Sequence, residues 1–249
     1  MHRFYIASQN ITQDTAVILD RKQIHHIRVV LRLKLQDPVE LFDDNGNEYS
    51  ARITEISSRN IALKIKERLS VSTNSVKITI ACAIPKKSRM DDIIDKLTQV
   101  GVDAIIPLKT DRVIVRLDKH RELIRLERWR KIAQGACQQS QRNTLVEVGR
   151  VIDVGELLNS AKDYDLKLLF TLSGKRQALK DILCACRPKG IIVLIGPEGD
   201  FSDEEVALAK KAGFVSASLG SSVLRVDTAA VCAASFIRLY YEETRGQDS

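Results

Sequence analysis

The sequence predicts an α/β protein in which a small, mostly β domain precedes a larger domain built on a parallel sheet. Period-two alternation of apolar residues dominates the first domain, whereas short apolar runs alternate with helical segments from residue 77 onward. The second pattern is typical of a buried parallel sheet covered by helices. A polar, Ser/Thr-rich stretch at 68–75 separates the two patterns, so we predict domains at 1–72 and 73–249.

The N-terminal domain is expected to be a small β-barrel that carries one helix. Asp43 to Gly46 form a hairpin signal between two of its strands. Asp20 can cap the helix, whose apolar residues between Ile24 and Leu31 fall on one face. Its strands are expected at 3–6, 38–42, 48–56 and 61–65.

The C-terminal domain is expected to alternate strands with helices. Its strands are predicted at 77–84, 104–108, 167–171, 190–195 and 215–219. Its helices are predicted at 90–100, 122–140, 176–186, 203–212 and 228–242.

The charge distribution favours a polyanionic partner. The chain carries 39 Lys+Arg against 32 Asp+Glu, and residues 76–150 alone hold 16 basic and 9 acidic residues. A localised basic region of this kind suits RNA. The sequence has no apolar run long enough to span a membrane and no signal peptide, so we expect a cytoplasmic protein without a membrane partner.

Several common kinds of site are not indicated. The five cysteines are scattered and odd in number, which argues against a disulfide framework. The four histidines do not cluster, so we predict no metal site. No P-loop, dinucleotide-binding glycine motif or nucleophile-elbow motif occurs.

Two glycine-bearing loops follow predicted strands and are the strongest candidates for a ligand site. Ile195–Ser202 leads into a helix capped by Ser202, and Ser218–Thr228 leads into the last helix, with Asp227 or Thr228 as its expected cap. Glycine lets the backbone approach a ligand closely, and parallel sheets bind ligands at the carboxyl ends of their strands. Each loop also fits a plain tight turn, and the pattern alone leaves both interpretations open.

Two charged residues add to this picture. Glu205 stands in the capping-box position for the first loop. Arg225 lies at a helix entry, where a positive charge is unfavourable to the helix dipole, so an anionic partner would explain it.

Both loops resemble one known family. The segments IGPEGDFS (195–202) and LGSSVLRVDTAA (219–230) are similar to those of the RsmE family, ribosomal RNA small-subunit methyltransferases that act on uracil N3 within the SPOUT superfamily. Further segments agree in order along nearly the whole chain, at 25–32, 41–43, 46–49, 96–102, 107–108, 129–133 and 139–142.

The resemblance implies a PUA-like N-terminal barrel followed by a SPOUT α/β domain tied in a deep trefoil knot. It implies a homodimer formed through the knotted domain. The implied activity is methyl transfer from S-adenosylmethionine to N3 of a uridine in 16S ribosomal RNA of the small ribosomal subunit, without a metal.

The resemblance also assigns roles to individual residues. Arg142 and Arg225 would stabilise the uracil anion, and Glu198, with Asp227 as a second candidate, would accept the N3 proton. Water or a phosphate of the substrate could accept the proton instead. The cofactor would be held by Thr171, Leu172, Ile195, Gly196, Pro197, Gly199, Leu219, Gly220, Leu224 and Thr228. RNA would be contacted by Arg3, Arg28, Arg32, Lys86, Arg89 and Arg112.

Three positions depart from the usual pattern of the family. Asp200 replaces a glycine, Asp227 replaces a glutamate, and Gln138 stands where a glutamate is usual. These changes bear on substrate positioning more than on cofactor binding. Two other functions stay open: a SPOUT methyltransferase with another RNA target, and a non-catalytic RNA-binding or ribosome assembly protein.

Overall fold

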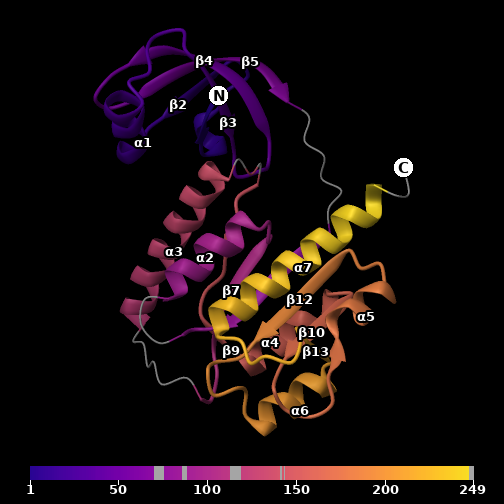
Figure 1. The fold of residues 1–249 in the computed structure, drawn as a ribbon. Helices are drawn as coiled ribbons and strands as arrows, with labels where there is room; N and C mark the ends of the chain where they lie inside the picture. Colours follow the sequence, from indigo (N-terminus) through magenta and orange to yellow (C-terminus); the bar gives the residue numbers. More distant parts are fainter. Residues whose placement is uncertain (70–75, 86–88, 113–118, 141, 143, 247–249) are drawn as a thin grey trace. The chain divides into compact units, whose positions relative to one another are not determined.

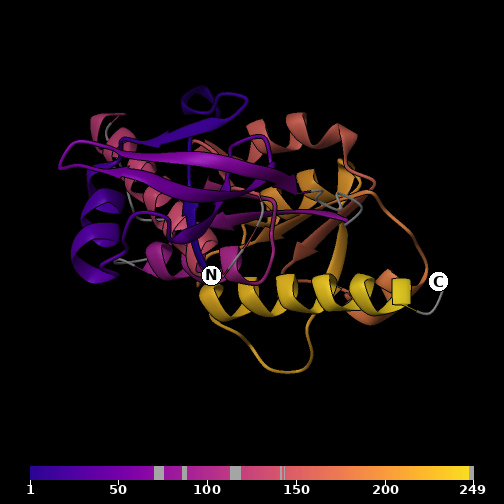
Figure 2. The same cartoon turned by 90° about the horizontal axis from the view of Figure 1, so that it is seen from above.

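Figures 1 and 2 show the computed structural model, which describes residues 1–69, 76–85, 89–112, 119–140, 142 and 144–246. The chain divides into two compact units. The first comprises Met1–Thr73 and Cys137–Leu145, and the second comprises Asn74–Ala136 and Val146–Ser249. The domain boundary predicted at residues 72 and 73 lies outside the described residues.

The first unit is built on one five-stranded sheet. Its strands are β1 (His2–Tyr5), β2 (Thr15–Ile18), β3 (Pro38–Phe42), β4 (Glu48–Ile56) and β5 (Ile61–Leu69). They lie in the order β1-β3-β4-β5-β2. β1 pairs with β3 in parallel, and the other neighbours pair antiparallel. The residues on the inner face of the sheet form one buried apolar cluster, which explains the period-two pattern of the sequence.

A short helical segment covers this cluster. Helix α1 (Arg21–His25) continues directly into a π-helical turn, His26–Val30. The Asp20 carboxylate accepts a hydrogen bond from a backbone N–H of the first turn at 2.9 Å, which confirms the predicted cap. Ile24 and Ile27 are buried in the cluster, as the apolar periodicity predicts.

The predicted hairpin turn between β3 and β4 is organised by a buried aspartate. Asp43 is only 1% exposed, and its carboxylate accepts hydrogen bonds from the backbone N–H groups of Asn45 (2.9 Å) and Asn47 (2.8 Å). The Tyr49 hydroxyl donates to the same carboxylate at 3.1 Å. Gly46 has a φ of +77°, a left-handed conformation that favours glycine. The aspartate therefore fixes a turn that glycine makes possible.

Two features of the first unit differ from the prediction. β5 runs beyond its predicted end at residue 65 because Arg68 and Leu69 pair with Tyr49 and Glu48 of β4. These residues were expected in the connection between the domains, and backbone pairing rather than side-chain alternation extends the strand. β2 was not predicted, because its apolar alternation covers only four residues in a polar context.

The second unit is built on one eight-stranded sheet. Its strands are β6 (Lys77–Ala83), β7 (Ala104–Lys109), β8 (Glu147–Val148), β9 (Ile152–Asp153), β10 (Leu166–Phe170), β11 (Gln177–Ala178), β12 (Gly190–Ile195) and β13 (Val215–Ser218). The order is β11-β13-β10-β12-β6-β7-β8, and β9 also pairs with β7. Every strand pair in this sheet is parallel, which confirms the sheet type predicted from the alternating pattern.

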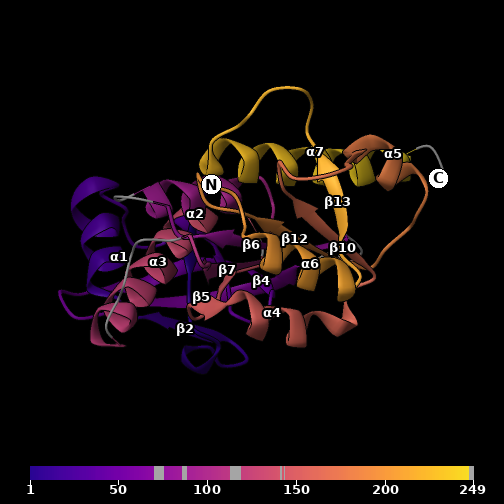
Figure 3. The same ribbon diagram turned by 90° about the horizontal axis from the view of Figure 1, so that it is seen from below.

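Helices cover both faces of this sheet. They are α2 (Arg89–Gln99), α3 (Lys119–Gln139), α4 (Val154–Ser160), α5 (Leu179–Cys184), α6 (Asp203–Lys211) and α7 (Val226–Gly246). Figure 3 shows α4 and α6 on one face and α2, α5 and α7 on the other. The core under α4 and α6 contains Ala81, Ile192 and Leu194 from neighbouring strands. The sheet is thus buried on both faces, as its nearly continuous apolar strands predict.

Three local predictions for the second unit are wrong. α7 begins at Val226, so Asp227 and Thr228 lie inside its first turn and neither is its cap. The helix expected at 176–186 begins only at Leu179, because Gln177 and Ala178 form the edge strand β11 instead. α4 was not predicted, since it is a single short helix that contains a glycine.

Candidate functional site

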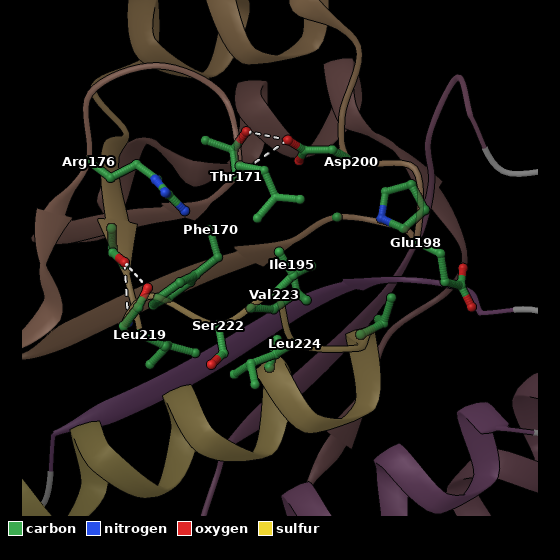
Figure 4. Close-up of a pocket in the computed structure, with 18 residues that line it drawn as sticks. Phe170, Thr171, Arg176, Ile195, Glu198, Asp200, Leu219, Ser222, Val223 and Leu224 are labelled. Carbon is green, nitrogen blue, oxygen red and sulfur yellow. Dashed lines mark hydrogen bonds between the residues drawn. The ribbon is translucent and has the colours of Figure 1, made fainter.

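A pocket with about 620 Å³ of open space lies at the carboxyl ends of β10, β12 and β13 (Figure 4). Three loops and the start of α7 line it, through Phe170, Thr171, Leu172, Arg176, Ile195, Gly196, Pro197, Glu198, Asp200, Ala217, Ser218, Leu219, Gly220, Ser222, Val223, Leu224, Val226 and Ala229. The three strands are neighbours in the parallel sheet, so their loops meet at one edge.

Most of the residues expected to hold the cofactor line this pocket. They are Thr171, Leu172, Ile195, Gly196, Pro197, Leu219, Gly220 and Leu224. Gly199 and Thr228 are not among the lining residues. The Gly199 carbonyl instead accepts a hydrogen bond from Arg112 Nη1 at 2.6 Å, and Thr228 is exposed in the first turn of α7.

The loop after β12 owes its shape to a close contact. A Cβ added to Gly196 would lie 3.0 Å from two ring carbons of Phe201, whose side chain is 1% exposed. Such a contact is tighter than side chains normally make, so a side chain at this position would displace the buried Phe201 ring. The loop therefore turns tightly beneath the pocket because Phe201 fills the space on its other side.

The same loop is anchored at the start of α6. Ser202 and Glu205 form the predicted capping box, with the Ser202 hydroxyl accepting from Glu205 N at 3.2 Å and the Glu205 carboxylate accepting from Ser202 N at 2.8 Å. The other Glu205 oxygen accepts from the backbone N–H of Asp111, just after β7, at 3.0 Å. The Ser202 hydroxyl also bonds Asp111 Oδ2 at 2.8 Å. These bonds fix the loop to a neighbouring strand end.

The loop after β13 presents apolar surface at the rim of the pocket. Gly220 has a φ of +128°, and its N–H donates to Ser218 Oγ at 3.2 Å. Figures 2 and 3 show the segment that leads into α7 as a wide loop standing away from the rest of the second unit. Val223 is 73% exposed and Leu172 is 51% exposed, so large apolar side chains border an open site. Exposed apolar surface next to a concave pocket marks a binding site.

Charged side chains reach the pocket from two sides. Arg176 points into it (Figure 4), and the structure gives this side chain no hydrogen bond or ion pair within the described parts of the chain. Arg176 was not among the residues predicted from the sequence, because an arginine in a polar loop carries no pattern. Glu198 lies at the opposite edge, and its carboxylate points away from the centre of the pocket.

Asp200, which replaces the glycine usual in the resembled family, has a φ of +61°. Its Oδ2 accepts hydrogen bonds from Thr171 Oγ1 and from Leu172 N, both at 2.8 Å (Figure 4). Its Oδ1 accepts from Phe201 N at 2.9 Å. The carboxylate thus connects the loop after β12 to the loop after β10.

Cys82 is a buried thiol near the two candidate bases. Cys82 near the end of β6 is fully buried, and burial raises its pKa to about 12, with the negative charges of Asp227 and Glu198 adding to the effect. Both carboxylates therefore lie close to this strand end. Asp227 Oδ1 is buried and has no hydrogen-bond partner among the residues that the structure describes. A buried unpaired oxygen is costly, so this atom is a ready acceptor for a donor brought beside it.

The two candidate catalytic arginines belong to different compact units. Arg225 directly precedes α7 and is exposed. Arg142 belongs to the first unit, where its backbone N–H donates to Cys137 O at 3.0 Å and its side chain is half-buried. Gln138, the third departure from the family pattern, donates to Gln23 Oε1 at 3.2 Å in the same unit.

The residues expected to contact RNA divide into two groups. Arg28 and Arg32 are exposed in the first unit. Arg3 is a correction, because its side chain is only 8% exposed, forms ion pairs with Glu48 and Glu40, and stacks over the Phe42 ring at 5.1 Å. A guanidinium that is buried and neutralised in this way stabilises the fold and is not available to a phosphate.

The other three expected RNA contacts lie in the second unit. Arg89 begins α2 and is half-buried, while Arg112 is exposed but already bonded to Gly199. Lys86 lies outside the described residues.

The comparisons with known proteins assign the chain to a family. Residues 72–238 match the model of an RNA methyltransferase domain, and residues 19–66 match the model of an RNA methyltransferase PUA domain. Ribosomal RNA small subunit methyltransferase E from Rickettsia conorii is 31% identical over 96% of this chain and 95% of its own length. This chain belongs to the ribosomal RNA small subunit methyltransferase E family. The enzyme class and the PUA-like first domain predicted from the two loops are therefore confirmed.

Another relative and two solved structures are similar along nearly the whole chain. The relative from Bacillus subtilis is 30% identical over 99% of both chains. A solved methyltransferase from Legionella pneumophila in complex with the cofactor S-adenosylmethionine superposes with a TM-score of 0.85 at 31% identity, covering 96% of this chain and 97% of its own. The methyltransferase E of Neisseria gonorrhoeae, bound to S-adenosylmethionine, has a TM-score of 0.83 at 31% identity and covers 97% and 98%.

Within the described ranges, no group of three or more His, Cys, Asp or Glu side chains is arranged to hold a metal ion. No described helix has the length and apolar character needed to cross a membrane.

Proposed function

We propose that the enzyme transfers a methyl group from S-adenosylmethionine to N3 of a uridine in 16S ribosomal RNA of the small subunit. The observation that carries the proposal is the pocket formed by the loops after β10, β12 and β13, which most of the expected cofactor residues line. The family membership and the related structures solved with bound S-adenosylmethionine support it.

The chemistry of the pocket fits this cofactor. Leu172, Leu219 and Val223 offer apolar surface for a flat adenine ring. Arg176 is suited to pair with the carboxylate of the methionine part. When bound, S-adenosylmethionine supplies a methyl group on a positively charged sulfur.

The residues of the chain would prepare the nucleophile. Uracil N3 carries a proton and attacks poorly until that proton leaves. Glu198 at the edge of the pocket, or Asp227 with its unpaired buried oxygen, would accept the proton. Arg225 and Arg142 would stabilise the negative charge that spreads onto the flanking carbonyl oxygens.

RNA binding would combine both units. N3 lies on the pairing edge of the base, so the uridine must be unpaired or flipped out of its helix before it can react. Arg28 and Arg32 in the PUA-like unit, with Arg89 and Arg112 in the other, would contact phosphates and make the affinity sensitive to salt.

We further propose that the enzyme works as a homodimer in the cytoplasm, where its ribosomal substrate is made. α7 supports the dimer, since it leaves Phe236 40% exposed and Leu239 57% exposed on its surface. Large apolar side chains exposed on one helix suit a subunit interface. The trefoil knot implied by the sequence resemblance stays a prediction.

The decisive experiment is methylation of small ribosomal subunits that lack the mark. Purified enzyme and S-adenosylmethionine should yield 3-methyluridine at one position of the 16S RNA, identified by mass spectrometry of nucleosides and mapping of the base. A 2′-O-methylated nucleoside, or modification of transfer RNA instead, would favour a different RNA target. Absence of both methyl transfer and cofactor binding would favour a non-catalytic RNA-binding protein.

A further inference from the structure

Asp200 has a backbone conformation that few residues other than glycine, asparagine and aspartate adopt. Its φ of +61° lies in the left-handed region, which glycine adopts freely and which side chains generally disfavour. A residue kept in such a conformation needs a compensating interaction with the surrounding structure.

The carboxylate of Asp200 supplies that interaction through both of its oxygens. Oδ2 accepts from Thr171 Oγ1 and from Leu172 N at 2.8 Å each, and Oδ1 accepts from Phe201 N at 2.9 Å. Thr171 Oγ1 in turn accepts from Ser173 N at 3.1 Å. One charged group therefore holds three consecutive residues of the loop after β10 against the loop after β12 (Figure 4).

These bonds act on the part of the loop that faces the pocket. Thr171 is 4% exposed beside the carboxylate, whereas Leu172 is 51% exposed and lines the pocket. No strand or helix holds residues 171–173, so the bonds to Asp200 fix their backbone. A loop that is already ordered loses less conformational freedom when a ligand binds, and the ligand then binds more tightly.

We propose that Asp200 is a positioning residue that preforms the cofactor pocket by holding the loop at Thr171–Ser173 in its binding conformation. This inference rests on the proposed function, namely that the pocket takes S-adenosylmethionine. The role is specific to this chain's carboxylate, since a glycine at position 200 would satisfy the backbone but could not hold the loop.

A competing role for Asp200 is a countercharge for the sulfonium of the cofactor. The two roles differ in their effect on S-adenosylhomocysteine, the product, whose sulfur is neutral. A positioning residue affects both nucleotides equally because both need the same loop. A countercharge affects only the positively charged one.

The test compares wild type with Asp200→Gly, a change that removes the carboxylate and suits the backbone. Calorimetry should show the Kd for both nucleotides raised by the same factor, about 10- to 100-fold, as expected for loss of charge-assisted hydrogen bonds. In the ligand-free protein, hydrogen exchange of the loop at 171–173 should become faster.

Two further variants act as controls. Asp200→Asn tolerates the left-handed conformation but retains only one acceptor oxygen, so its Kd values should lie between those of wild type and Asp200→Gly. Thr171→Val removes one partner of the carboxylate, and its effect should be much smaller in the Asp200→Gly background than alone.

The possible failures are distinguishable. If wild type binds both nucleotides and Asp200→Gly binds them equally well with unchanged exchange, the positioning role is overturned while the proposed function stands. A weakened affinity for S-adenosylmethionine alone overturns it in favour of a countercharge. If wild type binds neither nucleotide, the proposed function itself fails.

Discussion

The ring of Phe201 lies against Gly196, so that a Cβ at residue 196 would meet two ring carbons at 3.0 Å. Gly196→Ala should therefore push apart the ring and the loop, lowering the unfolding free energy by about 1–3 kcal/mol and weakening cofactor binding. Urea unfolding and calorimetry measure the two effects. Gly135→Ala is the matched control, because nothing lies within 4 Å of an added Cβ in α3 and the change should stabilise the helix. Equal behaviour of the two variants would show that Phe201 does not constrain the loop.

Arg176→Ala should weaken binding of S-adenosylmethionine about tenfold by removing a charge-assisted contact with its carboxylate. Stability should change little, because the side chain is exposed. Lys175→Ala changes the neighbouring charge, which does not line the pocket, and should bind the cofactor normally. Calorimetry measures the Kd for S-adenosylmethionine in the two variants, and a similar loss of affinity in both would indicate a general charge effect.

Glu198→Gln and Asp227→Asn should separate the two candidate bases. The variant that loses the proton acceptor should show kcat reduced about 10²- to 10⁴-fold with little change in the Kd for S-adenosylmethionine. Single-turnover methylation of small subunits gives the comparison. Wild-type rates in both variants would exclude these carboxylates as the proton acceptor.

The buried thiol predicts a specific pattern of reactivity. Cys184 and Cys232 are exposed, so at pH 8 they should react with iodoacetamide in the folded protein, while Cys82 should react only after unfolding. Mass spectrometry of alkylated peptides measures this directly, and rapid labelling of folded Cys82 would contradict its burial.

Cys82 also predicts a dependence of stability on pH. Its pKa is raised from 9.0 to about 12 by burial, then by the nearby carboxylates. Below pH 9 the thiol is protonated in both the folded and the unfolded protein. Above pH 9 the thiol ionises first in the unfolded chain, so the free energy of unfolding falls between pH 9 and 12. Cys82→Ala should reduce that fall by up to about 1.4 kcal/mol per pH unit. Identical slopes in urea unfolding of the two proteins would argue against the raised pKa.

Substitution of Arg3 should affect stability, whereas substitution of Arg28 should affect RNA binding. Arg3→Ala should destabilise the PUA-like unit by about 3 kcal/mol, because it leaves two carboxylates without their buried partner. Arg28→Ala should leave stability unchanged while lowering RNA affinity and the slope of log affinity against log salt by about one. Filter binding at several salt concentrations and urea unfolding test both variants. If only Arg3→Ala changed the salt dependence of RNA binding, Arg3 rather than Arg28 would be the RNA contact.

The sequence predicted the sheet of the second unit well, because its strands are nearly continuous apolar runs. Gly190–Ile195 has the bounds that the pattern indicates, and the capping box of Ser202 and Glu205 fixes the start of α6. Edge strands such as Gln177–Ala178 could not be predicted from the sequence. Both of these residues are exposed, so the strand has no apolar pattern.

The candidate site was also predicted in part from the sequence. Its glycine loops carry a recognisable pattern, so eight of the eighteen residues that line the pocket were predicted to hold the cofactor. Arg176 and the connection from Asp200 to Thr171 were missed, because both depend on which loops the fold brings together. Burial of Arg3 was missed for the same reason, since no local pattern distinguishes a paired arginine from a free one.

The pocket is lined by residues near positions 171, 196 and 220 and by the first turn of α7. During translation, none of the earlier segments can form it alone, because β13 and the start of α7 follow them in the chain. A nascent chain would thus be unable to capture the nucleotide until the first turn of α7 had left the ribosome. Products truncated before this turn cannot compete for the nucleotide.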